Sequence, residues 1–415
     1  MVVADALRVV DAEPDLTGLR SVFQPIVDLA TGAVVAHEGL TRGPAGAWHR
    51  PEDLFARART TGHLAELDEH CRRLALATAL EAGAAGPSAL FLNIEPDGIP
   101  LGPPPPDAVT FAARGGRIVL EFTERALTGD PARLQWFATR LRHVGIAVAL
   151  DDVGSHPASL ALMPFLRPEV VKLDQRLVQE PLDEDVARVA AAVGDYAERN
   201  DAVVIAEGIE TAEHERTARA LGATLGQGYR FGRPAALDPT PGTPPPAGPM
   251  APTAWAPEGP ARLSPLAAVA RLHPLRRGPV EEVRLAATLI EQRARSAEGP
   301  TVLLGSVGPD GIPRGERARR FAFVAEHSTL VTLFGVGTAL PRGVRGAVLA
   351  DDDPLRTEWD VAVVGPHVAA ALVARPYGDG EMEYAVVYDR DLVMEVARSL
   401  MSRTVPAPGA EMPGR

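Results

Sequence analysis

The sequence predicts an α/β fold in which a TIM-like (β/α)8 barrel with one antiparallel strand is followed by a smaller mixed α/β domain. Strand-like and helical patterns alternate through the first half, which is typical of a parallel sheet with helices outside. Polar side chains recur where the predicted strands end. The length of 415 residues exceeds the usual single-domain size, so we expect two domains.

Eight apolar runs of strand length are expected to form the barrel. They lie at Ser21–Leu29, Ala33–Leu40, Ala89–Ile94, Arg117–Phe122, Ile146–Leu150, Val170–Leu173, Ala202–Ala206 and Gly226–Phe231. Only a few residues around Thr31 and Gly32 join the first two runs, which is too short for a helical crossover. We therefore expect that pair to be antiparallel and the barrel to be imperfect.

Helical patterns separate most of these runs. They lie at Leu54–Thr61, His63–Ala84, Pro131–His143, Asp183–Arg199 and Thr211–Leu221. Each places apolar residues three and four positions apart, as one buried helix face requires. Asp130 followed by Pro131 is a favourable helix start, because aspartate caps the free amides and proline suits the first helical position.

Proline and glycine divide the chain. Residues 238–262 are rich in both, and proline supplies no backbone donor for a regular ladder. We interpret this segment, which contains Trp255, as a linker between a barrel over 17–237 and a second domain over 263–404. Residues 1–16 and 405–415 are expected to be tails, the latter disordered.

The second half predicts a mixed α/β order. Helices are expected at Pro279–Ala297, His367–Val373 and Asp391–Met401, and strands at Thr301–Gly305, Phe321–Glu326, Leu330–Phe334, Ala347–Leu349, Val361–Gly365 and Tyr384–Tyr388. The arginine-rich stretch at 314–320 is interpreted as a solvated helix face rather than an anion site.

Composition excludes several classes of protein. The net charge of −12 and pI near 5.4 argue against a duplex nucleic-acid binder. The chain starts without a basic leader and contains no long apolar run, so we expect neither secretion nor a membrane span. The single cysteine, Cys71, cannot form an intrachain disulfide and is expected to be a packed thiol. These features favour a cytoplasmic protein.

Polar side chains at the carboxyl ends of the predicted strands are the main functional signal. They are Glu38, Asn93, Glu121, Asp151, Asp152, Lys172, Glu207 and Gln227. In a closed parallel barrel these strand ends surround one mouth. Carboxylate and amide oxygens without a His or Cys cluster suit Mg²⁺ or Mn²⁺ better than zinc. The sequence therefore predicts metal-assisted attack on a phosphate.

The adjacent pair Asp151 and Asp152 is the most informative. Neighbouring side chains of a strand point to opposite faces, but both can reach the mouth where the backbone turns at the strand end. Asp151 is expected to bridge two metals and Asp152 to bind one. Glu38, Asn93 and Glu121 then complete one ion and Glu207 completes the other. Such a clamp activates a water as hydroxide and holds the phosphoryl oxygens during in-line displacement.

Two further polar residues are assigned supporting roles. Lys172 is a compact cation suited to orienting the attacking water or offsetting charge in the transition state. Gln227 is expected to fix a metal-bound water or a nearby carboxylate. The simpler alternative for Lys172 is a structural ion pair with Asp174.

These residues also resemble the ordered motifs of EAL domains over about residues 17–237. The matching segments are FQPIVD at 23–28, HEGLTR at 37–42, LNI at 92–94, LEFTE at 120–124, LDDVG at 150–154, VKLD at 171–174, AEGIE at 206–210 and QGYRFGRP at 227–234. That family comprises phosphodiesterases that linearise the bacterial second messenger cyclic di-GMP.

The resemblance implies a barrel that uses Mg²⁺ or Mn²⁺, with two ions expected, to open cyclic di-GMP to linear pGpG, usually as a homodimer. By motif position it implies that Glu38, Asn93, Glu121, Asp151, Asp152 and Glu207 bind metal, that Lys172 and Gln227 position water, and that Gln24 and Arg42 contact substrate. Glu210 and Glu124 resemble residues that hold the loop after Asp152.

The sequence departs from the family pattern at two places. Gly39 replaces the alanine of the EAL triplet, where no polar chemistry is involved. Residues 152–160 read DVGSHPASL where the family usually has DFGTGYSSL, so Val153, His156 and Pro157 differ. This loop favours a competing hypothesis, a cyclic di-GMP receptor without turnover. A scaffold that has lost nucleotide binding is disfavoured, because every metal-site position is retained.

The second domain carries fewer signals. Glu358-Trp359-Asp360 and the following VAVVGPHVAAALVARP resemble the DICT domain, a sensory module found beside cyclic di-GMP enzymes. This implies a regulatory signal or protein partner of unknown identity, and no binding residue is assigned. The alternative is a structural dimerisation domain.

Overall fold

The computed structural model describes most of the chain. The described residues are 18–44, 48–83, 88–95, 104–123, 127, 129–156, 158–237, 263–308, 311–335, 340–378 and 380–404. The predicted tails, the predicted linker and Trp255 lie outside them.

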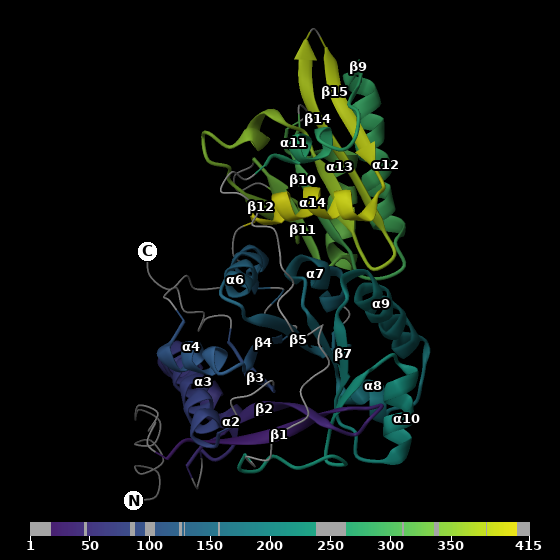
Figure 1. The fold of residues 1–415 in the computed structure, drawn as a ribbon. Coiled ribbons are helices and arrows are strands. Elements are labelled where there is room, and N and C mark those ends of the chain that lie inside the picture. The colour runs from purple at the N-terminus through teal and green to yellow at the C-terminus, as the bar shows by residue number, and fades with distance from the viewer. Residues whose placement is uncertain are drawn as a thin grey trace, which may run out of the picture. The chain divides into compact units, whose positions relative to one another are not determined.

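Eight strands close into a barrel in chain order, which confirms the predicted fold class (Figure 1). They are β1 (Arg20–Asp28), β2 (Val34–Arg42), β3 (Ala89–Asn93), β4 (Arg117–Thr123), β5 (Ala147–Val153), β6 (Val170–Leu173), β7 (Val203–Ala206) and β8 (Leu225–Gln227). Only β1 runs against its neighbours, pairing antiparallel with β2 and β8. The expected antiparallel pair is therefore confirmed.

Local chemistry explains the ends of β1 and β8. Asp28 Oδ1 accepts bonds from Thr31 N and Thr31 Oγ1 at 2.7 and 2.9 Å, which closes the tight β1–β2 turn. The run expected to continue to Phe231 ends at Gln227 instead. Gly228 has φ +157° and lies so close to Ile209 that a Cβ would be 2.2 Å from its carbonyl oxygen. The chain therefore turns away there.

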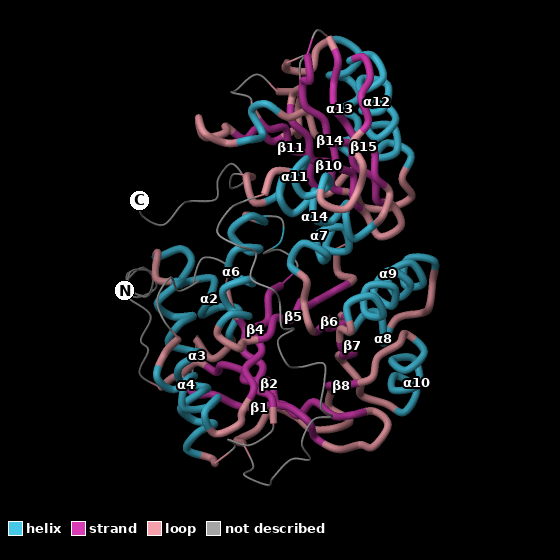
Figure 2. Tube along the Cα trace, turned by 45° about the horizontal axis from the view of Figure 1, so that its top comes forward, coloured by secondary structure: helices cyan, strands magenta, loops and turns pink. Residues whose placement is uncertain are grey.

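Helices of the first unit lie on two sides of the barrel strands (Figure 2). The five expected helices are present as α2 (Pro51–Thr61), α3 (Leu64–Glu81), α6 (Pro131–His143), α9 (Glu184–Asn200) and α10 (Ala212–Ala220). Three others, α4 (Pro106–Ala113), α7 (Ala158–Leu166) and α8 (Gln175–Gln179), were not expected. α7 reads ASLALMPFL, which is apolar on all sides and contains Pro164, so it lacks the amphipathic spacing that predicts a helix.

Apolar side chains fill the barrel interior. They include Ile26, Ala36, Phe91, Val119, Ala149, Val170, Ile205 and Leu225, all buried. Alternation along a strand sends every second side chain inward, so this set forms layers inside the barrel. Farther toward the carboxyl ends, the inward positions become polar.

The structure groups into two compact units. The first contains residues 1–123, 139–153 and 168–254, and the second contains 124–138, 154–167 and 255–415. All eight barrel strands belong to the first unit. The segments that follow β4 and β5, which carry the start of α6 and all of α7, group with the second.

A seven-stranded sheet forms the centre of the second unit, in the order β12-β11-β10-β13-β14-β15-β9. Its strands are β9 (Arg276–Pro279), β10 (Val302–Ser306), β11 (Leu330–Phe334), β12 (Arg345–Ala347), β13 (Val361–Val364), β14 (Ala369–Gly378) and β15 (Glu381–Val387). Its helices are α11 (Pro265–Ala270), α12 (Val280–Ser296), α13 (Gly315–His327), α14 (Arg390–Met401) and the short 3-10 turn η2 (Pro354–Thr357). The expected mixed α/β domain is confirmed at this level.

Two predictions in this unit are wrong. Phe321–Glu326, expected as a strand, lies inside α13, where Phe321 and Val324 pack three residues apart into the core. His367–Val373, expected as a helix, leads into and forms β14, since its alanine-rich run is paired on both sides by β13 and β15. Tertiary pairing overrides the helix propensity of alanine there. α11 and β9 were not expected.

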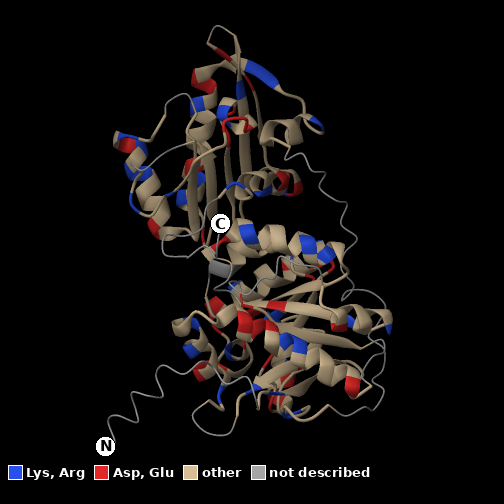
Figure 3. Cartoon of the chain, turned by 90° about the vertical axis from the view of Figure 1, so that its left-hand side faces the viewer, with Lys and Arg blue, Asp and Glu red and all other residues tan. Residues whose placement is uncertain are grey.

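The arginines of the 314–320 stretch are partly structural. Arg317 Nε and Arg320 Nη2 lie 3.2 and 2.5 Å from the two carboxylate oxygens of Glu291 on α12. Glu291 is 1% exposed. The two arginines therefore neutralise a buried acid between α12 and α13. In Figure 3, basic residues (blue) and acidic residues (red) are interspersed along the chain.

Among the described residues, no helix combines the length and apolar character needed to cross a bilayer.

A buried ion pair ties α6 to the barrel. Arg142 Nε and Nη2 donate to the two oxygens of Glu169 at 2.6 and 3.2 Å, and Glu169 Oε2 also accepts from Val148 N. Both side chains are about 5% exposed or less. This bidentate arrangement satisfies a carboxylate that would otherwise be uncompensated in the interior.

We predict that Arg142→Met destabilises the chain by about 3–5 kcal/mol, because Glu169 is left buried without its counter-ion. Arg199→Met is the matched control, since Arg199 pairs with Asp195 at an exposed site and should cost at most about 1 kcal/mol. Urea unfolding followed by circular dichroism measures both. Equal midpoints for the two variants would show that the buried pair contributes no more than the exposed one.

Candidate metal and phosphate site

The predicted strand-end residues converge at one mouth of the barrel. Lys172 Nζ lies 2.6 Å from Glu207 Oε1, 2.8 Å from Glu121 Oε1, 3.2 Å from Asp151 Oδ1 and 3.6 Å from Glu38 Oε2. These residues come from five different strands or strand ends, β2, β4, β5, β6 and β7. The structure therefore brings together residues that are up to 169 positions apart in sequence.

Lys172 is the only lysine in the sequence, whereas the other 41 of its 42 basic Lys and Arg residues are arginines. Its side chain is 1% exposed. An ammonium is a compact charge with three donors, while a guanidinium is a planar fork. A compact charge can face several carboxylates at once inside the narrow barrel. The alternative partner Asp174 instead caps α8 and pairs with Arg176 at 3.1 Å.

Amide side chains complete one side of the site. Asn93 Nδ2 donates to Glu38 Oε1 at 3.0 Å, and Gln227 Nε2 donates to Glu38 Oε2 at 2.6 Å. Gln227 Nε2 also lies 3.3 Å from Gln24 Oε1. Glu38 is thus held on both oxygens, and a chain of amides links it to Gln24 on β1.

Asp151 and Asp152 both reach the mouth because β5 is irregular there. The pairing of β5 with β6 shifts register between Leu150 and Val153, as a bulge does. Asp152 takes φ +58°, a left-handed conformation that aspartate tolerates better than most residues. Oxygens of Asp151, Asp152 and Glu207 consequently lie within 4.8 Å of one another. The backbone turn that we expect at this strand end is therefore a β-bulge.

Electrostatics at the mouth are dominated by burial and surplus negative charge. Burial raises the pKa of Glu121 well above its usual value, with repulsion from Glu38 adding to it. Burial also raises the pKa of Asp151, and that of Glu207 to about 8. For Glu38, burial alone would raise the pKa, but Lys172 and the two amides outweigh it and lower the pKa.

The charges at the mouth do not balance with Lys172 alone. Burial opposes the charge on Lys172, yet Asp151, Glu121 and Glu207 raise its pKa well above the usual value, so it stays an ammonium. The same mouth holds five carboxylates, those of Glu38, Glu121, Asp151, Asp152 and Glu207. Among the described residues, the carboxylates at this mouth therefore outnumber the facing ammonium, and further cations would offset their repulsion. An all-oxygen set of this kind suits Mg²⁺ or Mn²⁺.

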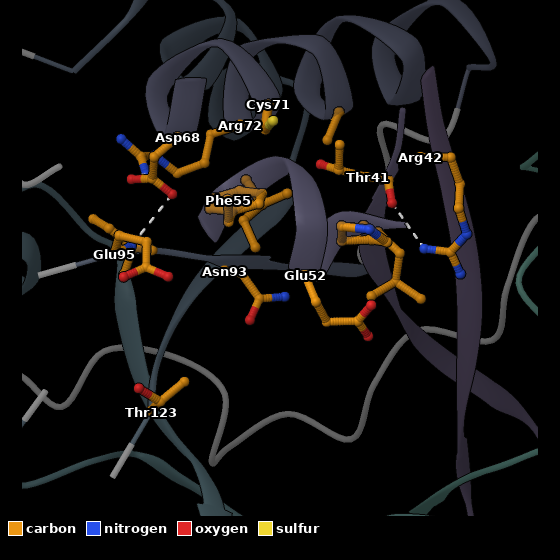
Figure 4. A pocket seen from close by; sticks show the side chains of 16 residues that line it. Thr41, Arg42, Glu52, Phe55, Asp68, Cys71, Arg72, Asn93, Glu95 and Thr123 are labelled. Atoms are coloured by element: carbon orange, nitrogen blue, oxygen red, sulfur yellow. Dashed lines mark hydrogen bonds and ion pairs between the residues drawn. The ribbon is translucent and has the colours of Figure 1, made fainter. Parts of the chain in front are cut away.

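A cavity of about 310 Å³ adjoins the mouth beside β2 and β3 (Figure 4). Arg42 and Asn93 line it together with Glu52 and Phe55 from α2, and these side chains are labelled in Figure 4. The sequence motifs indicated no functional role for the cavity residues that α2 and α3 contribute. Thr123, which also lines the cavity, ends β4 and carried the same strand-end signal as the chosen residues.

Two residues near this cavity are explained by packing. Cys71 on α3 is buried, and burial raises the pKa of its thiol to about 11, which confirms the expected packed thiol. Gly39 on β2 lies where an added Cβ would be 3.1 Å from Leu92 and 3.2 Å from Ala75. Close approach of α3 to β2 therefore favours the smallest residue in place of the family's alanine.

Some predicted residues are not part of the cluster. Glu210 is exposed after β7, and its backbone N–H donates to His214 Nδ1 at 3.3 Å; no partner of its carboxylate is found among the described residues. Glu124 and Pro157 lie outside the described part of the chain. Val153 is fully buried and His156 is exposed.

We predict that Lys172→Met lowers the stability of the metal-free chain by about 3–5 kcal/mol, because three buried carboxylates and that of the partly exposed Glu207 lose their ammonium. Millimolar Mg²⁺ or Mn²⁺ should raise the melting temperature of this variant more than that of the unmodified chain. Thermal melts with and without metal measure this. An unchanged melting temperature for Lys172→Met would contradict the central place given to this cation.

A known protein family and several curated proteins match the part of the chain that forms the barrel. The EAL domain family matches residues 11–234, which is more than half of the chain. The cyclic di-GMP phosphodiesterase NbdA of Pseudomonas aeruginosa is 29% identical over 224 residues, covering 52% of this chain and 29% of that protein. The probable cyclic di-GMP phosphodiesterase PdeB of Escherichia coli is 28% identical, covering 51% and 42%.

Two further proteins also match about half of this chain. A signalling protein of Caulobacter vibrioides is 31% identical over 225 residues, covering 52% of this chain and 27% of that protein. The chain thus spans well under half the length of these curated relatives. Among solved structures, the calcium and cyclic di-GMP complex of Klebsiella pneumoniae BlrP1 is 27% identical, covers 53% of this chain and 56% of that one, and has a TM-score of 0.46.

Proposed function

Since this chain belongs to the EAL domain family, we propose that it hydrolyses one phosphodiester bond of cyclic di-GMP to give linear pGpG, using Mg²⁺ or Mn²⁺. The observation that carries the proposal is the convergence of five carboxylates, Asn93 and Gln227 around Lys172 at one barrel mouth. The relatives NbdA and PdeB are named as a cyclic di-GMP phosphodiesterase and a probable one, which supports cyclic di-GMP as the substrate.

Six residues would hold the metal ions. They are Glu38, Asn93, Glu121, Asp151, Asp152 and Glu207. The proximity of Asp151, Asp152 and Glu207 supports one ion at that side, and the linked pair Glu38 and Asn93 supports another. When bound, such ions neutralise the phosphoryl oxygens and make a water more acidic.

The remaining residues would position the reactants. Lys172 is placed to orient the attacking water and to offset negative charge that develops on the phosphate. Gln227 holds Glu38, and Gln24 continues that amide chain toward β1. Arg42 lines the adjoining cavity, where a guanidinium suits a phosphate or a base edge. Glu210, which is exposed, is proposed to act only by steadying the loop that follows Asp152.

We predict that Glu38→Gln lowers kcat for cyclic di-GMP by at least about a hundredfold, because a metal-binding carboxylate is lost while the size of the side chain is kept. Glu213→Gln, at an exposed position in the first turn of α10, is the matched control and should not change kcat. Separation of pGpG from substrate by chromatography measures the rate. A Glu38→Gln variant with an unchanged rate would remove Glu38 from the metal site.

A cyclic di-GMP receptor without turnover is the second candidate. The observation that favours it is the altered segment after Asp152, where Val153 is buried and His156 is exposed. Incubation with cyclic di-GMP and Mn²⁺ separates the two functions: product means enzyme, while saturable binding without product means receptor. A chain that neither binds nor cleaves cyclic di-GMP would contradict both.

The second unit is proposed to regulate the barrel as a DICT-like sensory domain, in a cytoplasmic protein that acts as a homodimer. Support comes from contacts inside the second unit, where α7 packs against α14. Arg398 Nη2 donates to Pro164 O at 3.2 Å, and Gln135 Nε2 donates to Arg398 O at 3.2 Å. α7 begins only a few residues after Asp152 along the chain, and we propose that its anchoring in the second unit influences the proposed metal site through this short connection.

We predict that Arg398→Ala lowers kcat for cyclic di-GMP about two- to thirtyfold, since an anchored α7 holds the loop after Asp152 in place. Glu395→Ala, at an exposed position on the same helix, is the control and should leave kcat unchanged. If both variants have the unmodified rate and stability, the anchor has no role in regulation.

A further inference from the structure

A second cavity, of about 560 Å³, lies in the second unit at the carboxyl ends of β10 and β11. Ser306 and Phe334 are the last residues of these two parallel strands, and the segment around η2 forms the opposite wall. In open α/β sheets, ligands bind in the crevice outside the carboxyl ends of parallel strands. The volume is within the range of small-molecule sites.

Trp359 places an unpaired hydrogen-bond donor at this cavity. Its side chain is 2% exposed, and its indole Nε1 has no partner among the described residues. Gly308 packs against the ring with φ +64°, where a Cβ would be 2.5 Å from a ring atom, so only glycine allows this contact. A buried donor without an acceptor has lost its bond to water without replacement, and a bound acceptor would restore it.

Two hydrogen bonds join neighbouring walls of the cavity. Ser306 Oγ donates to Glu358 O at 3.1 Å and accepts from Asp360 N at 2.8 Å, which ties the end of β10 to the segment that carries Trp359. Asp360 is fully buried. Val307, Val348 and Pro376 add apolar side chains to the lining, and each of them is at least partly exposed.

One basic side chain at the cavity can pair with an anion. Arg356 lines it, and its Nη1 bonds to Leu349 O and to Asp351 Oδ1, both at 3.2 Å. The Arg356–Asp351 pair is exposed and therefore weak, so a ligand anion can compete for the guanidinium. The acid in the lining, Glu358, is already engaged, since its Oε2 accepts from Leu266 N at the start of α11.

We infer that this cavity binds a small organic anion with an apolar, ring-sized body. The body packs on the accessible apolar side chains of Val307, Val348 and Pro376, an acceptor atom takes the Trp359 Nε1–H bond, and the anionic group pairs with Arg356. This site is separate from the barrel mouth and does not depend on the proposed phosphodiesterase activity.

The test uses the full chain labelled with ¹⁵N at its four tryptophan indoles, with 1-naphthoate as the probe. Trp359→Phe identifies the Trp359 signal. We expect saturable 1-naphthoate binding to shift that indole resonance, and Arg356→Gln to weaken binding by about tenfold or more, since a charge-assisted bond is lost. The neutral 1-naphthamide should bind the unmodified chain and Arg356→Gln equally.

A larger side chain at the edge of the cavity provides a second test. Val348→Phe narrows the cavity at a position that is 77% exposed, so it should fold normally and abolish binding. The inference is overturned if millimolar 1-naphthoate leaves the Trp359 resonance unmoved, or if binding is the same in the unmodified chain, Arg356→Gln and Val348→Phe.

Discussion

One buried ammonium facing four carboxylates is the interaction on which the barrel mouth depends. Lys172 lies within 3.6 Å of Glu38, Glu121, Asp151 and Glu207, and its side chain is almost inaccessible. Charges of this kind are stable in an interior only when they are close and well placed. The apolar layers below, formed by residues such as Phe91 and Ile205, hold the strands so that these charges meet.

The balance of charge at this mouth connects structure to function. Among the described residues, the carboxylates outnumber the one ammonium that faces them, and burial raises the pKa values of Glu121 and Glu207. A surplus of carboxylate oxygens is suited to take up divalent ions. The same surplus of negative charge needs rigid neighbours, and the amides of Asn93 and Gln227 supply them for Glu38.

Irregular backbone supplies what regular strands cannot. The bulge in β5 and the left-handed Asp152 bring two adjacent carboxylates to one side. From there the chain passes directly into the segment that groups with the second unit and carries α7. The residues that depart from the EAL pattern, Val153 and His156, lie at this junction. Val153 is the last residue of its segment of the first unit, and His156 belongs to the second unit.

The sequence by itself determined the barrel, the antiparallel first pair and the polar strand ends, because short-range periodicity and turn length govern them. Gly226–Phe231 was predicted too long, since only packing against Ile209 turns the chain at Gly228. Phe321–Glu326 and His367–Val373 were assigned the wrong element, because their local patterns are ambiguous and sheet pairing decides between them.

Only the tertiary structure decided which polar residues meet. Strand-end position alone did not separate Glu207, which contacts Lys172, from Glu210, which is exposed three residues later. Nor did it indicate that Arg317 and Arg320 would neutralise Glu291 from another helix. Such contacts depend on distances between elements far apart in sequence, and these distances are set by packing of the whole fold rather than by local pattern.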